Sequence, residues 1–122
     1  MKNIIIIAGS RNITENAENY QQLEQIVDFY IQNLSDVIIV SGGCRGIDRL
    51  GEHYAVKHHL ECWRCPADWK KYGKKAGPMR NAKMAAIATH LIAFPSPTSR
   101  GTIDMINKAN NKGLAVRIKT LV

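Results

Sequence analysis

Five short, mostly apolar runs alternate with longer segments of helical periodicity, and this alternation leaves very few folds open to the chain. The runs span Asn3–Ala8, Asp36–Val40, Leu60–Cys65, His90–Phe94 and Leu114–Ile118. Apolar runs of this length are typical of strands that are buried on both faces of a parallel sheet. Since consecutive parallel strands must be joined by a crossover, the segments between the runs are expected to be helices.

The clearest predicted helix lies between the first two runs, where apolar residues recur at intervals of three and four. This stripe consists of Tyr20, Leu23, Ile26, Val27, Tyr30, Ile31 and Leu34. Further helices are expected over Asp48 to about His59, Pro78 to about Thr89, and Thr102 to about Lys112, with Gly113 as a C-cap. Right-handed crossovers then predict an α/β, Rossmann-like doubly wound parallel sheet of about five strands, with order 3-2-1-4-5 and helices on both faces.

Length and composition fit one nucleotide-binding domain over residues 1–122. The 122 residues are 45% hydrophobic and 22% charged, which suffices for one core. No run approaches the roughly 18 apolar residues of a membrane span, and Ile4–Ala8 is too short for a signal-peptide core. We therefore expect a cytoplasmic protein that makes no membrane contact.

The cysteines and histidines do not have the spacing of a metal site, so we expect neither a metal nor a cofactor. Three cysteines, an odd number, argue against a disulfide framework. Cys62 and Cys65 form a C-x-x-C, but they lie in a predicted strand, where positions three apart face opposite sides. Cys44 precedes a predicted helix and is a weak candidate for a nucleophile, because no partner base can be assigned to it.

Three turns that contain glycine and arginine follow the first, second and fourth runs: Gly9–Arg11, Ser41–Asp48 and Ser99–Thr102. Backbone N–H groups at such strand-to-helix turns are unpaired, and glycines let a phosphate approach them closely. With strand order 3-2-1-4-5 the three turns meet where the sheet reverses direction. Together with the formal net charge of +7, this predicts one shared pocket for an anionic ligand.

Each of these turns also has a simpler interpretation, because glycines in strand-to-helix turns often satisfy backbone geometry alone. Asp48 either accepts hydrogen bonds from ribose hydroxyls or caps the helix that begins there. A long basic loop is predicted over Pro66–Asn81, which is unusual in a small domain. Its aromatic residues, Trp69 and Tyr72, are candidates for stacking on a base, although Trp69 could equally pack onto the core.

Taken together, the motifs resemble the SLOG superfamily, and most closely its YspA, cpYpsA-related branch. The matching segments are Gly9–Arg11, Ser41–Asp48, Pro66–Trp69, Ala76–Met84 and Arg100–Met105. The resemblance implies a Rossmann-like fold and a nucleotide-derived ligand, with ADP-ribose-like and cyclic signalling molecules as candidates. It also implies that homo-oligomers are common. Similar SLOG domains act as sensors in bacterial defence systems, whereas the related LOG phosphoribohydrolases cleave the base from nucleoside monophosphates.

The turns and the resemblance together give the candidate ligand-binding residues. These are Gly9, Ser10, Arg11, Ser41, Gly42, Gly43, Arg45, Asp48, Arg80, Asn81, Ser99, Arg100, Gly101 and Thr102. LOG enzymes carry a catalytic glutamate three residues after a Gly-Thr pair, and Met105 occupies that place here. Asp104 lies one residue earlier, which turns it about 100° around a helix.

A binding protein that senses or sequesters its ligand, in bacterial defence or phage counter-defence, is therefore favoured over an enzyme. A nucleotide N-glycosidase that uses Asp48 or Asp104 is the alternative, since hydrolysis needs a carboxylate or an equivalent group. A third interpretation is single-stranded nucleic-acid binding through the aromatic and basic residues of Trp69–Lys75.

Overall fold

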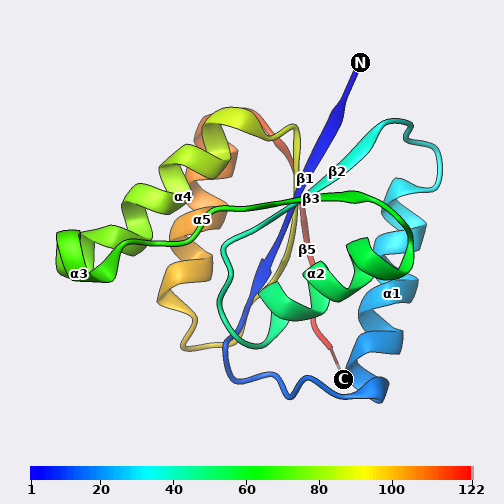
Figure 1. Cartoon of the computed structure of the whole chain (residues 1–122), viewed down its shortest axis with the longest axis horizontal. Helices are drawn as coiled ribbons and strands as arrows, with labels where there is room; N and C mark the ends of the chain where they lie inside the picture. The colour runs from blue at the N-terminus through cyan, green and yellow to red at the C-terminus, as the bar shows by residue number, and fades with distance from the viewer. Residues whose placement is uncertain (122) are drawn as a thin grey trace.

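A parallel sheet of five strands forms the centre of the computed structural model, which describes residues 1–121 (Figure 1). The strands are β1 (Asn3–Gly9), β2 (Val37–Ser41), β3 (Glu61–Arg64), β4 (His90–Phe94) and β5 (Ala115–Ile118). They are ordered β3-β2-β1-β4-β5, and every neighbouring pair is parallel. The predicted Rossmann-like α/β fold and its strand order are confirmed.

Four longer helices cover the two faces of the sheet, two on each face (Figure 1). One face carries α1 (Ala17–Ile31) and α2 (Ile47–Lys57), and the other carries α4 (Ala76–Ile87) and α5 (Arg100–Asn111). Between β3 and α4 lie the one-turn helix α3 (Trp69–Tyr72) and a 3₁₀ turn, η1 (Gly73–Lys75). The chain therefore has three layers, with β1 in the middle of the central one.

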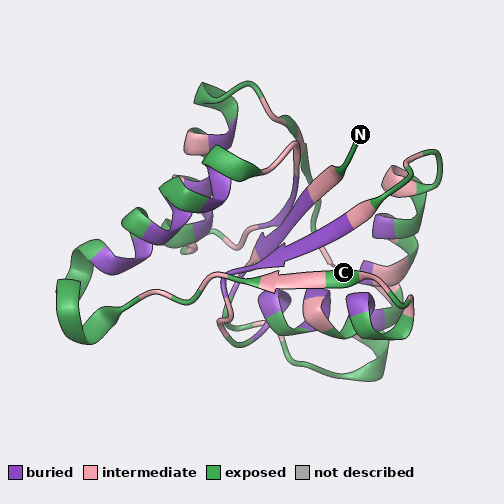
Figure 2. Cartoon of the chain, turned by 45° about the horizontal axis from the view of Figure 1, so that its top comes forward, coloured by how far each residue is buried: buried purple, intermediate pink, exposed green. Residues whose placement is uncertain are grey.

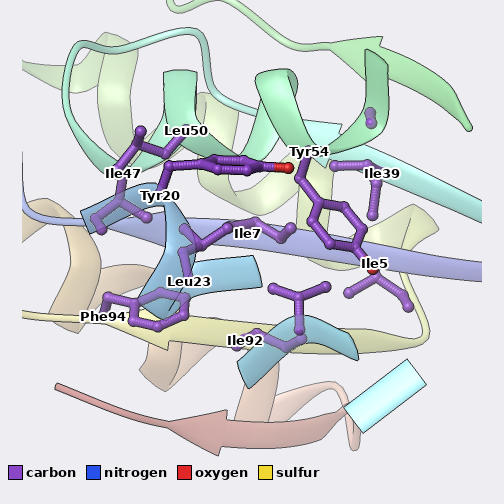
Figure 3. Packing of buried hydrophobic residues seen from close by; sticks show 12 residues of the cluster. Ile5, Ile7, Tyr20, Leu23, Ile39, Ile47, Leu50, Tyr54, Ile92 and Phe94 are labelled. Atoms are coloured by element: carbon purple, nitrogen blue, oxygen red, sulfur yellow. The ribbon is translucent and has the colours of Figure 1, made fainter. Parts of the chain in front are cut away.

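The side chains of β1 alternate between two apolar clusters, one on each face of the sheet. Ile5 and Ile7 pack beneath α1 and α2 (Figure 3), whereas Ile6 packs beneath α4 and α5. Because both faces are covered, β1, β2 and β4 are buried over most of their length (Figure 2). This double burial explains why their sequences are continuous apolar runs.

Several helix boundaries differ from the predicted ones. Helices α2, α4 and α5 each begin one or two residues earlier than expected, and the predicted loop over Pro66–Asn81 contains α3, η1 and the start of α4. The Asp68 carboxylate accepts from the amide of Lys71 and so caps α3. The turn after β1 does not open into a helix, because α1 begins only at Ala17, where the Asn16 side chain caps it. Gly113 has φ of +76° and ends α5, as predicted.

The two cysteines of the C-x-x-C motif face opposite sides of the sheet, as predicted. Cys62 packs against the α1–α2 cluster and Cys65 against the α4–α5 cluster. Within residues 1–121, no helix is both long enough and apolar enough to cross a bilayer.

Candidate functional site

A pocket of about 590 Å³ lies at the carboxyl ends of the central strands. Its lining comes from the turn after β1, the turn before α2, helices α3 to α5, and the loop after β4. Of the candidate ligand-binding residues, Gly9, Ser10, Arg11, Arg45, Asp48, Arg80, Asn81, Ser99, Arg100, Gly101 and Thr102 line it, together with Trp69 and Asp104. Ser41, Gly42, Gly43 and Tyr72 are absent from the lining that the described residues form. The pocket therefore brings together segments about ninety residues apart.

Unused hydrogen-bond donors gather where α5 begins, in the lining of the pocket. Ser99 is the N-cap residue, but its hydroxyl contacts the backbone N–H and the hydroxyl of Ser96 instead of the helix. Within residues 1–121, the amides of Gly101 and Thr102 have no acceptor. The hydroxyl of Thr102 also has no partner there, although the residue is only 7% exposed. These groups, at the positive end of a helix dipole, are suited to bind a phosphate.

The turn after β2 uses most of its donors within the chain. The hydroxyl of Ser41 accepts from the amide of Gly43 at 3.0 Å and donates to Glu52 at 2.6 Å. The amide of Cys44 donates to Asp48, and the amide of Gly46 donates to Glu15. The expectation that Ser41, Gly42 and Gly43 present a row of free N–H groups is therefore wrong at Gly43, because the Ser41 hydroxyl already accepts from the Gly43 amide.

Asp48 is buried where the turns after β1 and β2 meet, with only 6% of its surface exposed. One carboxylate oxygen accepts from the amide of Cys44 at 3.2 Å, four residues earlier. The helix cap is Gly46, so Asp48 does not cap the first turn of α2 as the simpler interpretation had it. Burial raises the pKa of Asp48 to about 6, against the opposing effects of the Cys44 amide and the Arg80 charge.

Arg80 and Asn81 connect the turn after β2 to the start of α5 across the pocket. Arg80 is 8% exposed and donates to the carbonyl of Gly42 at 2.8 Å and to the side chain of Asn81 at 2.9 Å. The amide group of Asn81 donates to the carbonyl of Gly101 and to Asp104, both at 3.0 Å. Because both side chains are held at several points, they fix the relative position of the two turns.

Positive charge dominates the pocket lining. The basic residues that line it are Arg11, Arg45, Lys74, Arg80 and Arg100, against the carboxylates of Asp48 and Asp104. Asp104 is already paired with Lys108 at 2.5 Å. Within the described chain, Arg100 forms no hydrogen bond or ion pair through its side chain, whereas Arg45 donates to the carbonyl of Arg11 at 3.2 Å. The pocket therefore attracts anions and has a cation free to bind one.

Trp69 forms an aromatic wall at the mouth of the pocket and belongs to neither core cluster. Its side chain rests on Gly77, where an added Cβ would come within 2.9 Å of the ring. The guanidinium carbon of Arg11 lies 5.6 Å from the ring centroid. With 46% of its surface exposed, Trp69 does not pack onto the core as one interpretation had it, and part of the ring is available for stacking.

The two residues that bear on catalysis have different environments. Met105 is 1% exposed, packs in the α4–α5 cluster and also lines the pocket floor. Asp104 lies at the pocket edge, but Asn81 and Lys108 occupy both of its oxygens. Asp48 is thus the only lining carboxylate among the described residues without an ion-pair partner.

Sequence reasoning missed two carboxylates that hold the turn before α2. Glu52 bonds Ser41 and pairs with Arg64 at 2.6 Å, and Glu15 accepts from the amide of Gly46. Glu52 could have been found, because it follows Asp48 by four residues and so shares its helix face. Glu15 could not, since it lies in an irregular segment whose path no sequence pattern indicates.

A model of the YspA, cpYpsA-related SLOG family matches residues 3–72. The chain belongs to this family. The match covers more than half of the sequence, from β1 to the end of α3, so that the pocket residues of α4 and α5 lie outside it. The chain is also 30% identical over 118 residues to the Gene 61 protein of Mycobacterium phage D29, covering 92% of each protein.

Two solved structures share the fold of this SLOG chain at low sequence identity. DNA processing protein A (DprA) from Streptococcus pneumoniae aligns with a TM-score of 0.72 at 19% identity. The alignment covers 97% of this chain but only 50% of DprA, so the chain spans half of that protein. The structural genomics target TM1055 aligns with a TM-score of 0.69 at 16% identity, over 95% of this chain and 72% of that one.

Proposed function

We propose that the pocket binds a nucleotide or a nucleotide-derived signalling molecule, of the ADP-ribose-like or cyclic kind, and that the protein senses or sequesters it. The observation that carries this proposal is the group of unused donors at the start of α5. Two backbone amides and the Thr102 hydroxyl have no partner among the described residues, and the unpaired Arg100 lies beside them. Since Gly101 and Thr102 both line the pocket, an oxyanion bound there would accept from these donors.

The rest of the lining suits the other parts of a nucleotide. Asp48 has acceptor capacity left for ribose hydroxyls, and its charge disfavours a phosphate at its own position. Trp69 offers an aromatic surface for a base at the pocket mouth. A phosphate at α5, a ribose at Asp48 and a base at Trp69 would together place each part of a nucleotide against a matching group of the lining.

A protein that only binds its ligand can act as a sensor or as a sequestering protein, and the two differ in whether they need a partner. Sensing requires an effector that reads the bound state, whereas sequestration of a signalling nucleotide requires none. The phage-encoded relative makes sequestration, as a counter-defence device in the host cytoplasm, the version that we favour. Assembly into a homo-oligomer is part of this proposal.

The test is to identify what the protein retains. Purified protein is incubated with ADP-ribose, cyclic ADP-ribose isomers and nucleoside monophosphates, washed, heat-denatured, and the released molecules are identified by mass spectrometry. We expect one intact nucleotide at near-stoichiometric yield. Recovery of no nucleotide from any of these incubations, with the protein folded by circular dichroism, would contradict the proposal.

Hydrolysis of an N-glycosidic bond is a second candidate, and the environment of Asp48 favours it. Burial raises the pKa of this carboxyl to about 6, which is near the range in which a side chain can work as a general acid or base. This candidate predicts free base and ribose phosphate that accumulate with time. Loss of turnover in Asp48→Asn, with turnover intact in Asp104→Asn, would assign the role to Asp48.

A further inference from the structure

A strip of lysines continues from the mouth of the pocket along α3 and η1. Lys70, Lys71, Lys74 and Lys75 are all exposed, and Lys74 also lines the pocket. None of them forms an ion pair with a carboxylate of the described chain. This segment projects beyond the sheet at one end of the molecule (Figure 1), so its charge faces open solvent. A mononucleotide in the pocket would leave most of this charge unused.

Aromatic side chains lie among these lysines. Trp69 and Tyr72 are 46% and 40% exposed, and the ammonium group of Lys71 lies 5.1 Å from the Tyr72 ring centroid. Cations that meet phosphates, interleaved with rings on which bases stack, are the usual surface for a single strand of nucleic acid. An acidic protein would match the charge but not the aromatic rings.

The free donors at the start of α5 favour one part of a strand over the rest. Ser10, Thr102 and Met105 line the pocket and are almost completely buried, whereas Arg100 and Gly101 at the start of α5 are exposed. The free donors belong to Gly101 and Thr102, which both line the pocket. A terminal phosphate offers these donors three acceptor oxygens and about 1.5–2 negative charges, whereas an internal phosphodiester offers fewer free oxygens and less charge, so a phosphorylated end is the favoured ligand.

From this arrangement we infer that the ligand class extends to short single-stranded oligonucleotides, bound by a phosphorylated end. The terminal nucleotide occupies the pocket with its phosphate at Gly101 and Thr102, and the following phosphates lie along the lysine strip of α3 and η1. This inference rests on the proposed nucleotide site, because the same donors hold the terminal phosphate.

The experiment measures the affinity for phosphorylated oligonucleotides of one to six nucleotides, at 50 and 200 mM salt. Arms with a 5′-phosphate, a 3′-phosphate, no phosphate and a circular oligonucleotide distinguish which end is read. We expect affinity to rise with length and its salt dependence to steepen by about 0.7 in log–log slope for each lysine engaged. Three lysines would then contribute an extra loss of about 20-fold over this fourfold change in salt.

Matched variants distinguish the contribution of the lysine strip to affinity from that of the pocket. Replacing Lys70, Lys71 and Lys75 by Gln should remove the gain with length and leave mononucleotide affinity unchanged. Replacing Lys2, Lys112 and Lys119 by Gln removes the same charge elsewhere on the surface and should change neither. Thermal melting establishes that both variants are folded.

Three outcomes would overturn the inference while the proposed function stands: mononucleotides bind but affinity does not rise with length, circular oligonucleotides bind as well as linear ones, or the terminal phosphate makes no difference. Failure of every nucleotide to bind would instead overturn the proposed function itself.

Discussion

The turn after β2 and the turn after β4 both contain glycine and both lead into a helix. They differ in whether their backbone amides are hydrogen-bonded within the chain. In the first, side chains of the same chain accept from the amides of Gly43, Cys44 and Gly46. In the second, the amides of Gly101 and Thr102 find no acceptor within residues 1–121. Acceptor side chains near the turn, and not glycine content, thus decide whether a turn can receive an anion.

The role of each turn follows from this difference. The turn after β2 is a rigid wall, since Ser41, Asp48 and Glu15 accept from its backbone amides and Arg80 donates to its Gly42 carbonyl. The turn after β4 is the receiving turn, the one that binds the phosphate, because the Ser99 side chain leaves the N-terminus of α5 uncapped. Four changes, described here from the largest expected effect to the smallest, test this assignment.

The largest effect is expected when two exposed cations of the pocket are removed. In Arg11→Gln/Arg100→Gln, two charged contacts of about 1.5–3 kcal/mol each would be lost, so affinity should fall by about 100-fold or more. Both side chains are exposed, and the melting temperature should not change. Isothermal titration calorimetry measures the affinity, and a similar loss in Lys2→Gln/Lys112→Gln would show that only the overall charge matters.

The second effect concerns the pH dependence of stability that Asp48 produces. Its pKa rises from an ordinary value of 3.8 to about 6 because burial disfavours the charged form. The folded protein therefore holds the proton more tightly, and this contribution is complete below pH 3.8 and is lost as the pH rises through 6. The loss amounts to about 3 kcal/mol.

The variant Asp48→Asn cannot titrate, so it isolates this effect. Denaturant unfolding of both proteins between pH 4 and 7.5 should give a free-energy difference that moves in favour of the variant by about 2.4 kcal/mol, since part of the contribution is already lost at pH 4. Glu24 titrates in a lower range, because His58 and Lys57 lower its pKa to about 2, and it is the same in both proteins. A difference that stays constant over this range would show that Asp48 is not protonated near pH 6.

The fold was predictable from the sequence because the signals that specify it are local. The apolar runs gave the strands of the sheet, and the stripe that includes Tyr20, Leu23 and Val27 gave α1. The convergence of the three turns followed from strand order alone, and the pocket is where that order placed it.

The state of each donor could not be predicted, because it depends on contacts between residues distant in sequence. Glu15 reaches the amide of Gly46 across 31 residues, and Arg80 reaches the carbonyl of Gly42 across 38. Helix α3 was missed because its cap, Asp68, precedes only one turn, which is too short for any periodicity. The sequence thus indicated where the site lies but not which of its groups are free.

The third change tests the receiving turn directly. An added Cβ at Gly101 would meet no atom of the chain within 4 Å, and its φ is not positive, so Gly101→Ala should fold at least as well as the natural chain. The methyl group would instead extend into open space beside the free amides and crowd a ligand that binds them. We expect affinity to fall by about 10- to 100-fold, equivalent to one or two lost phosphate bonds, with an equal or higher melting temperature. Unchanged affinity would mean that no ligand approaches this turn.

The smallest effect is expected at the matching glycine of the other turn. An added Cβ at Gly42 would lie 2.5 Å from a guanidinium nitrogen of Arg80 and 2.9 Å from a carboxylate oxygen of Asp48, so Gly42→Ala must displace both side chains. Overpacking of this kind lowers the free energy of unfolding by about 1–3 kcal/mol, and we expect the lower end because the atoms met are the far ends of two side chains and not backbone. Since the φ of Gly42 is not positive, backbone strain adds nothing.

Denaturant unfolding and calorimetry on Gly42→Ala and Gly101→Ala together separate the two roles. Gly42→Ala should have a lower free energy of unfolding, and Gly101→Ala should have a lower affinity for the ligand. If Gly42→Ala instead kept its stability and lost the greater share of affinity, the turn after β2 would be the one that receives the phosphate. The internal hydrogen bonds of Gly43 and Cys44 would then have to open when the ligand binds.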